Sequence, residues 1–124
     1  MSSRPDFKPH LVITNGDMSG NIISEVTIIQ KLSMISYDVS WAGTAPVGSM
    51  SVQVSNTFTQ NGDGTVRNPG NWTTLVLSAP APVSGNSGNG MIDIDATGAY
   101  AIRLVYTRGS GTGLMNATIS AKAS

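Results

Sequence analysis

Few residues in this chain suit acid–base or nucleophilic chemistry, and their spacing is a weak catalytic pattern. The single histidine, His10, has no nucleophile near it in sequence, whereas a catalytic triad needs a base that a third group holds in place. Asp93 and Asp95 are two residues apart, so on a strand their carboxylates share one face about 7 Å apart. Inverting glycosidases use such a separation, but any alternating strand with two acids produces it. We therefore favour a solvated histidine, and aspartates that solubilise a strand or pair with Arg103.

Metal and phosphate sites are equally weakly indicated. Asn61–Gly64 offers oxygen ligands but lacks the spaced acids and the bidentate glutamate of a calcium loop, so a plain turn is favoured. Gly85–Gly90 and Gly109–Gly113 are glycine-rich, yet neither leads from a strand into a helix with a lysine, as a phosphate cradle does. Cysteine is absent, which excludes disulfides and thiolate chemistry. We predict no catalytic set, no metal and no cofactor, and we expect the protein not to be an enzyme.

The large aromatic residues suggest a second kind of site. Tyr37, Trp41 and Tyr106 fall in apolar register within alternating runs, where the core is the default position. Trp72 follows a polar stretch and stands at the entrance of a strand-like run, so it suits the rim of a binding site. With Tyr100 it forms the candidate glycan-binding pair, since aromatic rings stack on sugars, although core packing is favoured for Trp72 too.

Strands that would position these residues are predicted from the alternation of apolar and polar residues along the chain. The clearest segment is Tyr100–Ala121, in which two alternating runs are joined by the glycine-rich stretch Arg108–Gly113. This pattern predicts a β-hairpin. A second hairpin is predicted from Ser36–Ala42 and Ser49–Asn56, on either side of a turn-rich connection that contains Pro46.

The remaining segments complete an all-β reading, with no convincing helix. Four further runs are predicted as strands: Leu11–Thr14, Asn21–Gln30, Trp72–Leu77 and Met91–Asp95, the last with Ile92 and Ile94 inward. Thr57–Asn71 is predicted as a polar loop and Ser78–Gly90 as an arch between sheets. About eight short strands separated by turns predict a single-domain antiparallel β-sandwich over residues 11–124, jelly-roll-like or immunoglobulin-like.

Residues 1–10 contain two prolines and no periodicity. They are predicted to form an extended N-terminal arm, either frayed or laid across a neighbouring molecule. The candidate partner-binding residues of this arm are Arg4, Pro5, Phe7, Pro9 and His10.

Composition limits the classes of partner. The 124 residues suffice for one domain, and seven basic and seven acidic side chains give no net charge, with 11% charged residues against about a quarter in typical proteins. No basic footprint for nucleic acid is present, and no apolar run approaches the roughly 20 residues of a membrane span. The N-terminus lacks the apolar core of a signal peptide, so export by that route is not expected. A surface with few charges favours self-association.

Three blocks of the sequence resemble small β-sandwich proteins encoded among virion genes of tailed bacteriophages. The blocks are Ser36–Asn56, with a Trp-x-Gly-x-x-Pro-x-Gly turn and a Val-x-x-Ser-Asn strand end, Asn71–Leu75 (NWTTL), and Ala99–Ile119, with the segment RLVYTRGSGTG. In the first block this chain has one extra residue between Trp41 and Pro46. Residues 1–30 have no counterpart in the resemblance.

The resemblance implies a particle component. It predicts a capsid decoration or cement protein that binds major capsid or other virion proteins, forms a homo-oligomer (a trimer is favoured), and is located in the virion after assembly in the host cytoplasm. The alternative is a receptor- or glycan-binding module of a tail or head fibre, for which Trp72 and Tyr100 are the candidate residues.

Overall fold

The computed structural model describes residues 6–29, 34–75, 82–95 and 99–122. Within these ranges the chain forms strands and turns and no helix. The strands are β1 (Asp6–Asp17), β2 (Ile22–Ile23), β3 (Thr27–Ile28), β4 (Met34–Ser55), β5 (Thr59–Gln60), β6 (Val66–Asn68), β7 (Thr73–Thr74), β8 (Pro82–Val83), β9 (Ser87–Asp95) and β10 (Ala101–Lys122).

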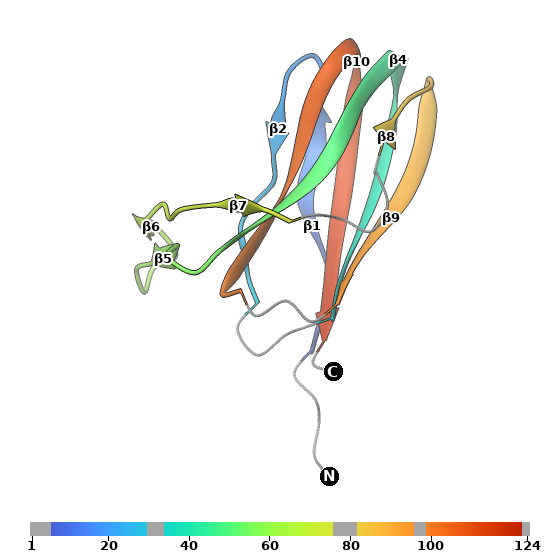
Figure 1. Ribbon diagram of the computed structural model, residues 1–124. Helices are drawn as coiled ribbons and strands as arrows, with labels where there is room; N and C mark the ends of the chain where they lie inside the picture. The colour runs from blue at the N-terminus through green and yellow to red at the C-terminus, as the bar shows by residue number, and fades with distance from the viewer. Residues whose placement is uncertain (1–5, 30–33, 76–81, 96–98, 123–124) are drawn as a thin grey trace.

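Two long strands, β4 and β10, form the centre of the molecule. Each has 22 residues, and they pair antiparallel from Ala101↔Ser55 to Lys122↔Met34. Register shifts occur only between Arg108 and Thr112, where both strands turn over together at the top of Figure 1. The ribbon of two strands is therefore folded onto itself, and its two halves belong to different layers.

The other strands extend each half of this ribbon. In the first layer, β1 pairs with residues 114–122 of β10 and β9 pairs with residues 34–42 of β4. In the second layer, β2 and β3 pair with the beginning of β10, while β8 and β7 pair with the end of β4. A separate two-stranded sheet, β5–β6, projects from the side of the body (Figure 1).

The core lies between the two layers. Along β4 and β10, alternate side chains point inward, and Tyr37, Val52, Leu104, Tyr106 and Met115 are fully buried there. On β9, Ile92 and Ile94 are buried and Asp93 is exposed. The prediction of an antiparallel β-sandwich is confirmed, as are the inward positions of the two tyrosines and the two isoleucines.

Both predicted hairpins are wrong in their pairing. The two runs of Tyr100–Ala121 lie within the single strand β10, and each pairs with β4 instead of with the other run. The same holds for Ser36–Ala42 and Ser49–Asn56, which are the two halves of β4. Alternation determines which side chains face inward, but it does not determine the partner strand. The glycine-rich connections bend a paired ribbon between layers, so neither forms a tight hairpin turn.

Close backbone contact explains the glycines at this bend. Gly43 and Gly113 are directly opposite each other, and a Cβ on either would overlap the facing backbone. Gly111 has φ +81°, and a Cβ there would overlap the carbonyl oxygen of Ala45. Ala45 itself has φ 47°, a conformation that is unfavourable for residues with a Cβ. Small residues are therefore required where the two strands turn over.

The structure differs from the predicted arm over residues 6–10, which form the first part of β1. Asp6 pairs with Lys122 and His10 with Ile119. The arm has this partner because the end of β10 offers a free edge, which the local sequence does not reveal. Residues 1–5 lie outside the described part of the chain.

Three further segments differ from expectation. The predicted loop Thr57–Asn71 contains the β5–β6 pair, and the predicted arch Ser78–Gly90 contains β8 and the start of β9. The predicted strand Asn21–Gln30 is interrupted and forms only β2 and β3. Of the predicted strand Trp72–Leu77, only β7 is strand, and residues 76 and 77 lie outside the described ranges.

Candidate functional site

Trp72 is engaged by neighbouring side chains instead of standing free. The guanidinium carbon of Arg103 lies 4.2 Å from the centroid of its ring, within the range of a cation–π contact. The Phe58 ring packs against it at 5.8 Å with an interplanar angle of 54°. The indole Nε1 donates a hydrogen bond to the carbonyl oxygen of Pro69, at 2.8 Å. These contacts fix Trp72 as a link between the β5–β6 projection and the second layer.

Arg103 lies on the outward side of the second layer, where its cross-strand neighbour Gln53 holds it in place. Its Nε donates to Oε1 of Gln53 at 2.8 Å, and Gln53 Nε2 donates to Oγ1 of Thr74 at 3.5 Å. Partial burial lowers the pKa of the Arg103 guanidinium. The expected neighbour relation between Arg103 and the β9 aspartates is not found in the strand pairing, because β9 pairs with the first half of β4 and Arg103 lies opposite Gln53 in the second half.

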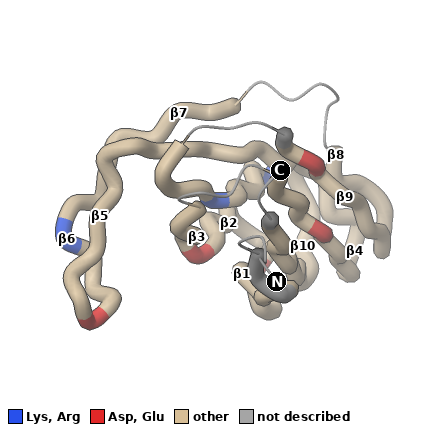
Figure 2. Tube along the Cα trace, turned by 90° about the horizontal axis from the view of Figure 1, so that it is seen from below, with Lys and Arg blue, Asp and Glu red and all other residues tan. Residues whose placement is uncertain are grey.

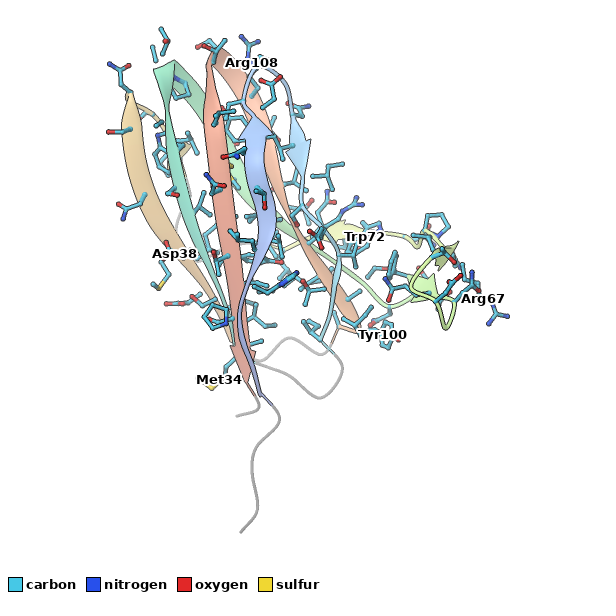
Figure 3. All side chains as sticks on the ribbon, turned by 180° about the vertical axis from the view of Figure 1, so that it is seen from behind. Met34, Asp38, Arg67, Trp72, Tyr100 and Arg108 are labelled. Atoms are coloured by element: carbon cyan, nitrogen blue, oxygen red, sulfur yellow. The ribbon has the colours of Figure 1, made fainter. Side chains whose placement is uncertain are left out.

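A shallow hollow lies beside this cluster, with a volume of about 240 Å³. Its lining is mainly small and polar: Val54, Ser55, Asn56, Thr57, Asn71, Thr73 and Ala99. Neither ring of the predicted glycan-binding pair lines it. Figure 3 shows Trp72 and Tyr100 at separate places on this side of the molecule, and no ring contact within the described ranges joins them. The two rings of the predicted pair are therefore not packed against each other.

The candidate acid and base residues are also dispersed. His10 Nε2 lies 3.7 Å from Glu25 Oε1, and both side chains are largely exposed. Asp93 is exposed on β9, and the side chain of Asp95 lies outside the described part. Among the described residues, no group of three or more histidine, aspartate or glutamate side chains is close enough to hold a metal ion.

Asn61–Gly64 forms the plain turn that was predicted. The Gly64 amide donates to the Asn61 carbonyl at 3.0 Å, and Gly64 has φ +89°. The Asp63 carboxylate accepts hydrogen bonds from the hydroxyl and the amide of Thr65, which lowers the pKa of Asp63. The Asn61 carbonyl oxygen and Oδ1 of Asp63 thus take part in the hydrogen bonds of the turn itself.

The candidate partner-binding residues lie at or beyond the start of β1. Pro9 and His10 are exposed there. Phe7 pairs with Ala121 through its backbone, and its side chain lies outside the described part. Arg4 and Pro5 precede the described ranges.

A surface that sequence reasoning missed is the outer surface of the first layer, which we call the outer face. Its side chains form cross-strand rows over β10, β4 and β9. The rows are Leu114–Ala42–Ser87, Asn116–Ser40–Asn89, Thr118–Asp38–Met91 and Ser120–Ser36–Asp93. All of these side chains are exposed or partly exposed. Figure 3 shows this layer towards the viewer, with Asp38 labelled.

Apart from the exposed apolar side chains of Leu114 and Met91, the outer face is built of small or polar side chains and carries few charges. Among its twelve residues, only Asp38 and Asp93 are ionisable. Figure 2 shows the charged residues scattered over the chain, with none of the described strands carrying a run of one sign. Alternation in the sequence does show that Asn116, Thr118 and Ser120 point away from the core. It does not show that the outward residues of β4 and β9 lie beside them.

No described segment forms a helix with the length and apolar character needed to cross a membrane. A comparison with protein-family models gives no match, and a comparison with curated proteins gives none either.

Proposed function

We propose that this chain is a non-enzymatic structural protein of a bacteriophage virion, which binds a neighbouring capsid subunit as a decoration or cement protein. The three sequence blocks that resemble virion β-sandwich proteins support the setting. The outer face supports the role of binding a neighbouring capsid subunit, and it is the main observation behind the proposal. Protein interfaces are depleted of charge at their centre. On this sheet surface, which is made mostly of serine, threonine and asparagine, only Asp38 and Asp93 would need a counter-charge from the partner.

Binding on a repeating shell also suits this kind of surface. Small side chains lose little rotamer entropy when they are immobilised, so the cost of ordering the face is low. Each contact can remain modest in affinity, since many copies that engage a symmetric particle add their effects.

The alternative, a glycan- or receptor-binding fibre module, has weaker support. Its main residue, Trp72, contacts Arg103 and Phe58 and donates its indole hydrogen to Pro69. A ring that is already packed offers less surface for stacking a sugar.

A charge placed at the centre of the outer face tests the proposal. Ser40 is exposed in the middle of β4 between Asn116 and Asn89. Ser40→Arg should weaken binding to particles assembled without this chain by at least about tenfold, because the long arginine side chain would hold the partner surface away from the small side chains around it. The matched control is Thr107→Arg, at an exposed position on the second layer. Occupancy is measured by co-sedimentation with particles, and folding by circular dichroism.

The two variants separate the possible outcomes. Loss of binding by Ser40→Arg alone supports the proposal. Full occupancy by Ser40→Arg, or equal loss by Thr107→Arg, overturns the assignment of the outer face. Failure of the unmodified protein to bind any capsid particle overturns the structural role itself.

A further inference from the structure

Strand β9 forms one lateral edge of the first layer. Within the described ranges it pairs only with β4, over nine consecutive residue pairs without a register shift. Figures 1 and 2 both show β9 as the outermost strand on its side. Its far side therefore presents a straight row of backbone donors and acceptors, with Met91 beside it at 66% exposure.

The opposite edge of the same layer, strand β1, is protected against pairing with another chain. The contrast suggests that the regular edge of β9 is suited to such pairing. Strand β1 has three register shifts against β10 and contains Pro9, and its Val12 carbonyl accepts a hydrogen bond from the Glu25 amide. Bulges and prolines are the usual devices that stop an edge strand from pairing with another chain. Strand β9 has neither.

The register of β9 against β4 identifies the backbone groups that remain free. The Gly43 amide donates to the Asn86 carbonyl at 2.7 Å, and this pair continues the register Ala42↔Ser87. Hydrogen-bonded pairs recur at every second residue of an antiparallel ladder, so residues 88, 90, 92 and 94 bond to β4. The amides and carbonyls of residues 87, 89, 91, 93 and 95 point to the free edge.

An antiparallel pair of two β9 strands centred on Met91 uses all of these free groups. In this register Met91 faces Met91 of the second copy, residue 89 faces 93, and residue 87 faces 95. Every opposed residue has an outward-pointing amide and carbonyl. If the pairing shifts by one residue, amides and carbonyls at the free edge of one copy face residues whose own amides and carbonyls bond to β4. A larger shift leaves some of the free backbone groups without a partner.

The side chains are complementary in the same register. Asp93 lies opposite Asn89 of the second copy, so a carboxylate meets an amide donor. The two exposed Met91 side chains meet at the two-fold axis and shield each other from water. By contrast, the register centred on residue 93 places two aspartates face to face, which is unfavourable.

We propose that two copies of this chain associate through β9, antiparallel and centred on Met91, to join their first layers into one continuous sheet. The interface is isologous, as a two-fold dimer requires. It is a pair, in contrast to the trimer favoured from the sequence. It does not depend on a virion location, so its failure and that of the proposed function are distinguishable.

Opposite charges at residue 91 provide the test. Met91→Lys and Met91→Asp each place two like charges at the axis, and each should raise the dimer dissociation constant by about tenfold or more. Mixed together, the two variants should form a heterodimer, because lysine then faces aspartate. Leu114→Lys is the matched control: Leu114 is also exposed on the outer face, but it lies on β10. Sedimentation equilibrium over a range of concentrations measures the association.

The expected result is a dimer for the unmodified protein and for Leu114→Lys, monomers for each charged variant at residue 91, and a restored dimer in their mixture. A monomeric or trimeric unmodified protein overturns the proposal. So does a dimer that Met91→Lys leaves intact, or a mixture that stays monomeric while each variant remains folded by circular dichroism.

Discussion

At the scale of single residues, the core contains two tyrosines that differ in one respect. Tyr37 and Tyr106 are both fully buried. The Tyr106 hydroxyl donates to the Val47 carbonyl at 3.3 Å, whereas the Tyr37 hydroxyl has no hydrogen-bond partner among the described residues. Burial raises the pKa of both phenols, and that of Tyr37 well above its usual range. A buried hydroxyl without a partner costs free energy that a phenylalanine would not.

This contrast predicts opposite effects of one substitution. Tyr37→Phe should leave the free energy of unfolding unchanged or raise it by about 1 kcal/mol, since an unsatisfied group is removed. Tyr106→Phe should lower it by about 1 kcal/mol, since a hydrogen bond is lost and the Val47 carbonyl loses a donor. Urea unfolding measures both. A larger loss for Tyr37→Phe than for Tyr106→Phe would contradict this account.

Residue-scale reasoning also explains why the sequence leaves Trp72 between two positions, the core and the rim of a site. Its sequence neighbours are polar, and its main partner, Arg103, is far from it in the chain. The alternation of residues 102–106 showed that Arg103 points away from the core. The contact itself arises only because β4 lies between β10, which carries Arg103, and β7, which directly follows Trp72.

At the scale of elements, the bend shared by β4 and β10 decides the architecture. Three glycines show how the backbone at this bend differs from the backbone of an ordinary turn. Gly62 has open space and ordinary φ; Gly64 has open space with φ +89°; Gly111 has φ +81° and lacks space, because the Ala45 carbonyl is in contact. The bend thus requires both a left-handed conformation and a close approach of two backbones.

Alanine substitutions at these glycines should therefore form a graded series. Gly62→Ala should change the free energy of unfolding little, and Gly64→Ala should lower it by about 1 kcal/mol because of its positive φ. Gly111→Ala should lower it by about 2 kcal/mol or more, because steric overlap is added to the same conformational cost. Thermal or urea unfolding checks the order. Equal losses at Gly64 and Gly111 would show that the close approach at the bend is unimportant.

At the scale of the whole molecule, the predicted arm can be tested in two parts. Residues 6–10 pair with β10, so their removal would expose the end of that strand. Residues 1–5 precede β1, and they include Arg4 and Pro5, which are predicted from the sequence as candidates for binding a partner. Removing residues 1–5 should leave the unfolding midpoint unchanged and lower particle occupancy. Removing residues 1–10 should also lower the midpoint. Undiminished occupancy after removal of residues 1–5 would show that they do not contribute to binding.

The sequence by itself determined that this chain is built of strands and which of their side chains face inward. Tyr37, Ile92, Ile94 and Tyr106 were placed correctly because a period of two is a local property, set by each residue and its immediate neighbours. Turn chemistry at Asn61–Gly64 was local too, and it was also predicted correctly.

Only the tertiary structure decided which strands are partners and which surfaces remain free. The two halves of β10 have the pattern of a hairpin, yet both pair with β4, because the two long strands bend as one ribbon and pack their apolar sides against each other. The assembly of the outer face from β10, β4 and β9, and the open edge of β9, follow from that bend. Pairing between segments far apart in the chain depends on the free energy of the whole packed core, which no single stretch of sequence contains.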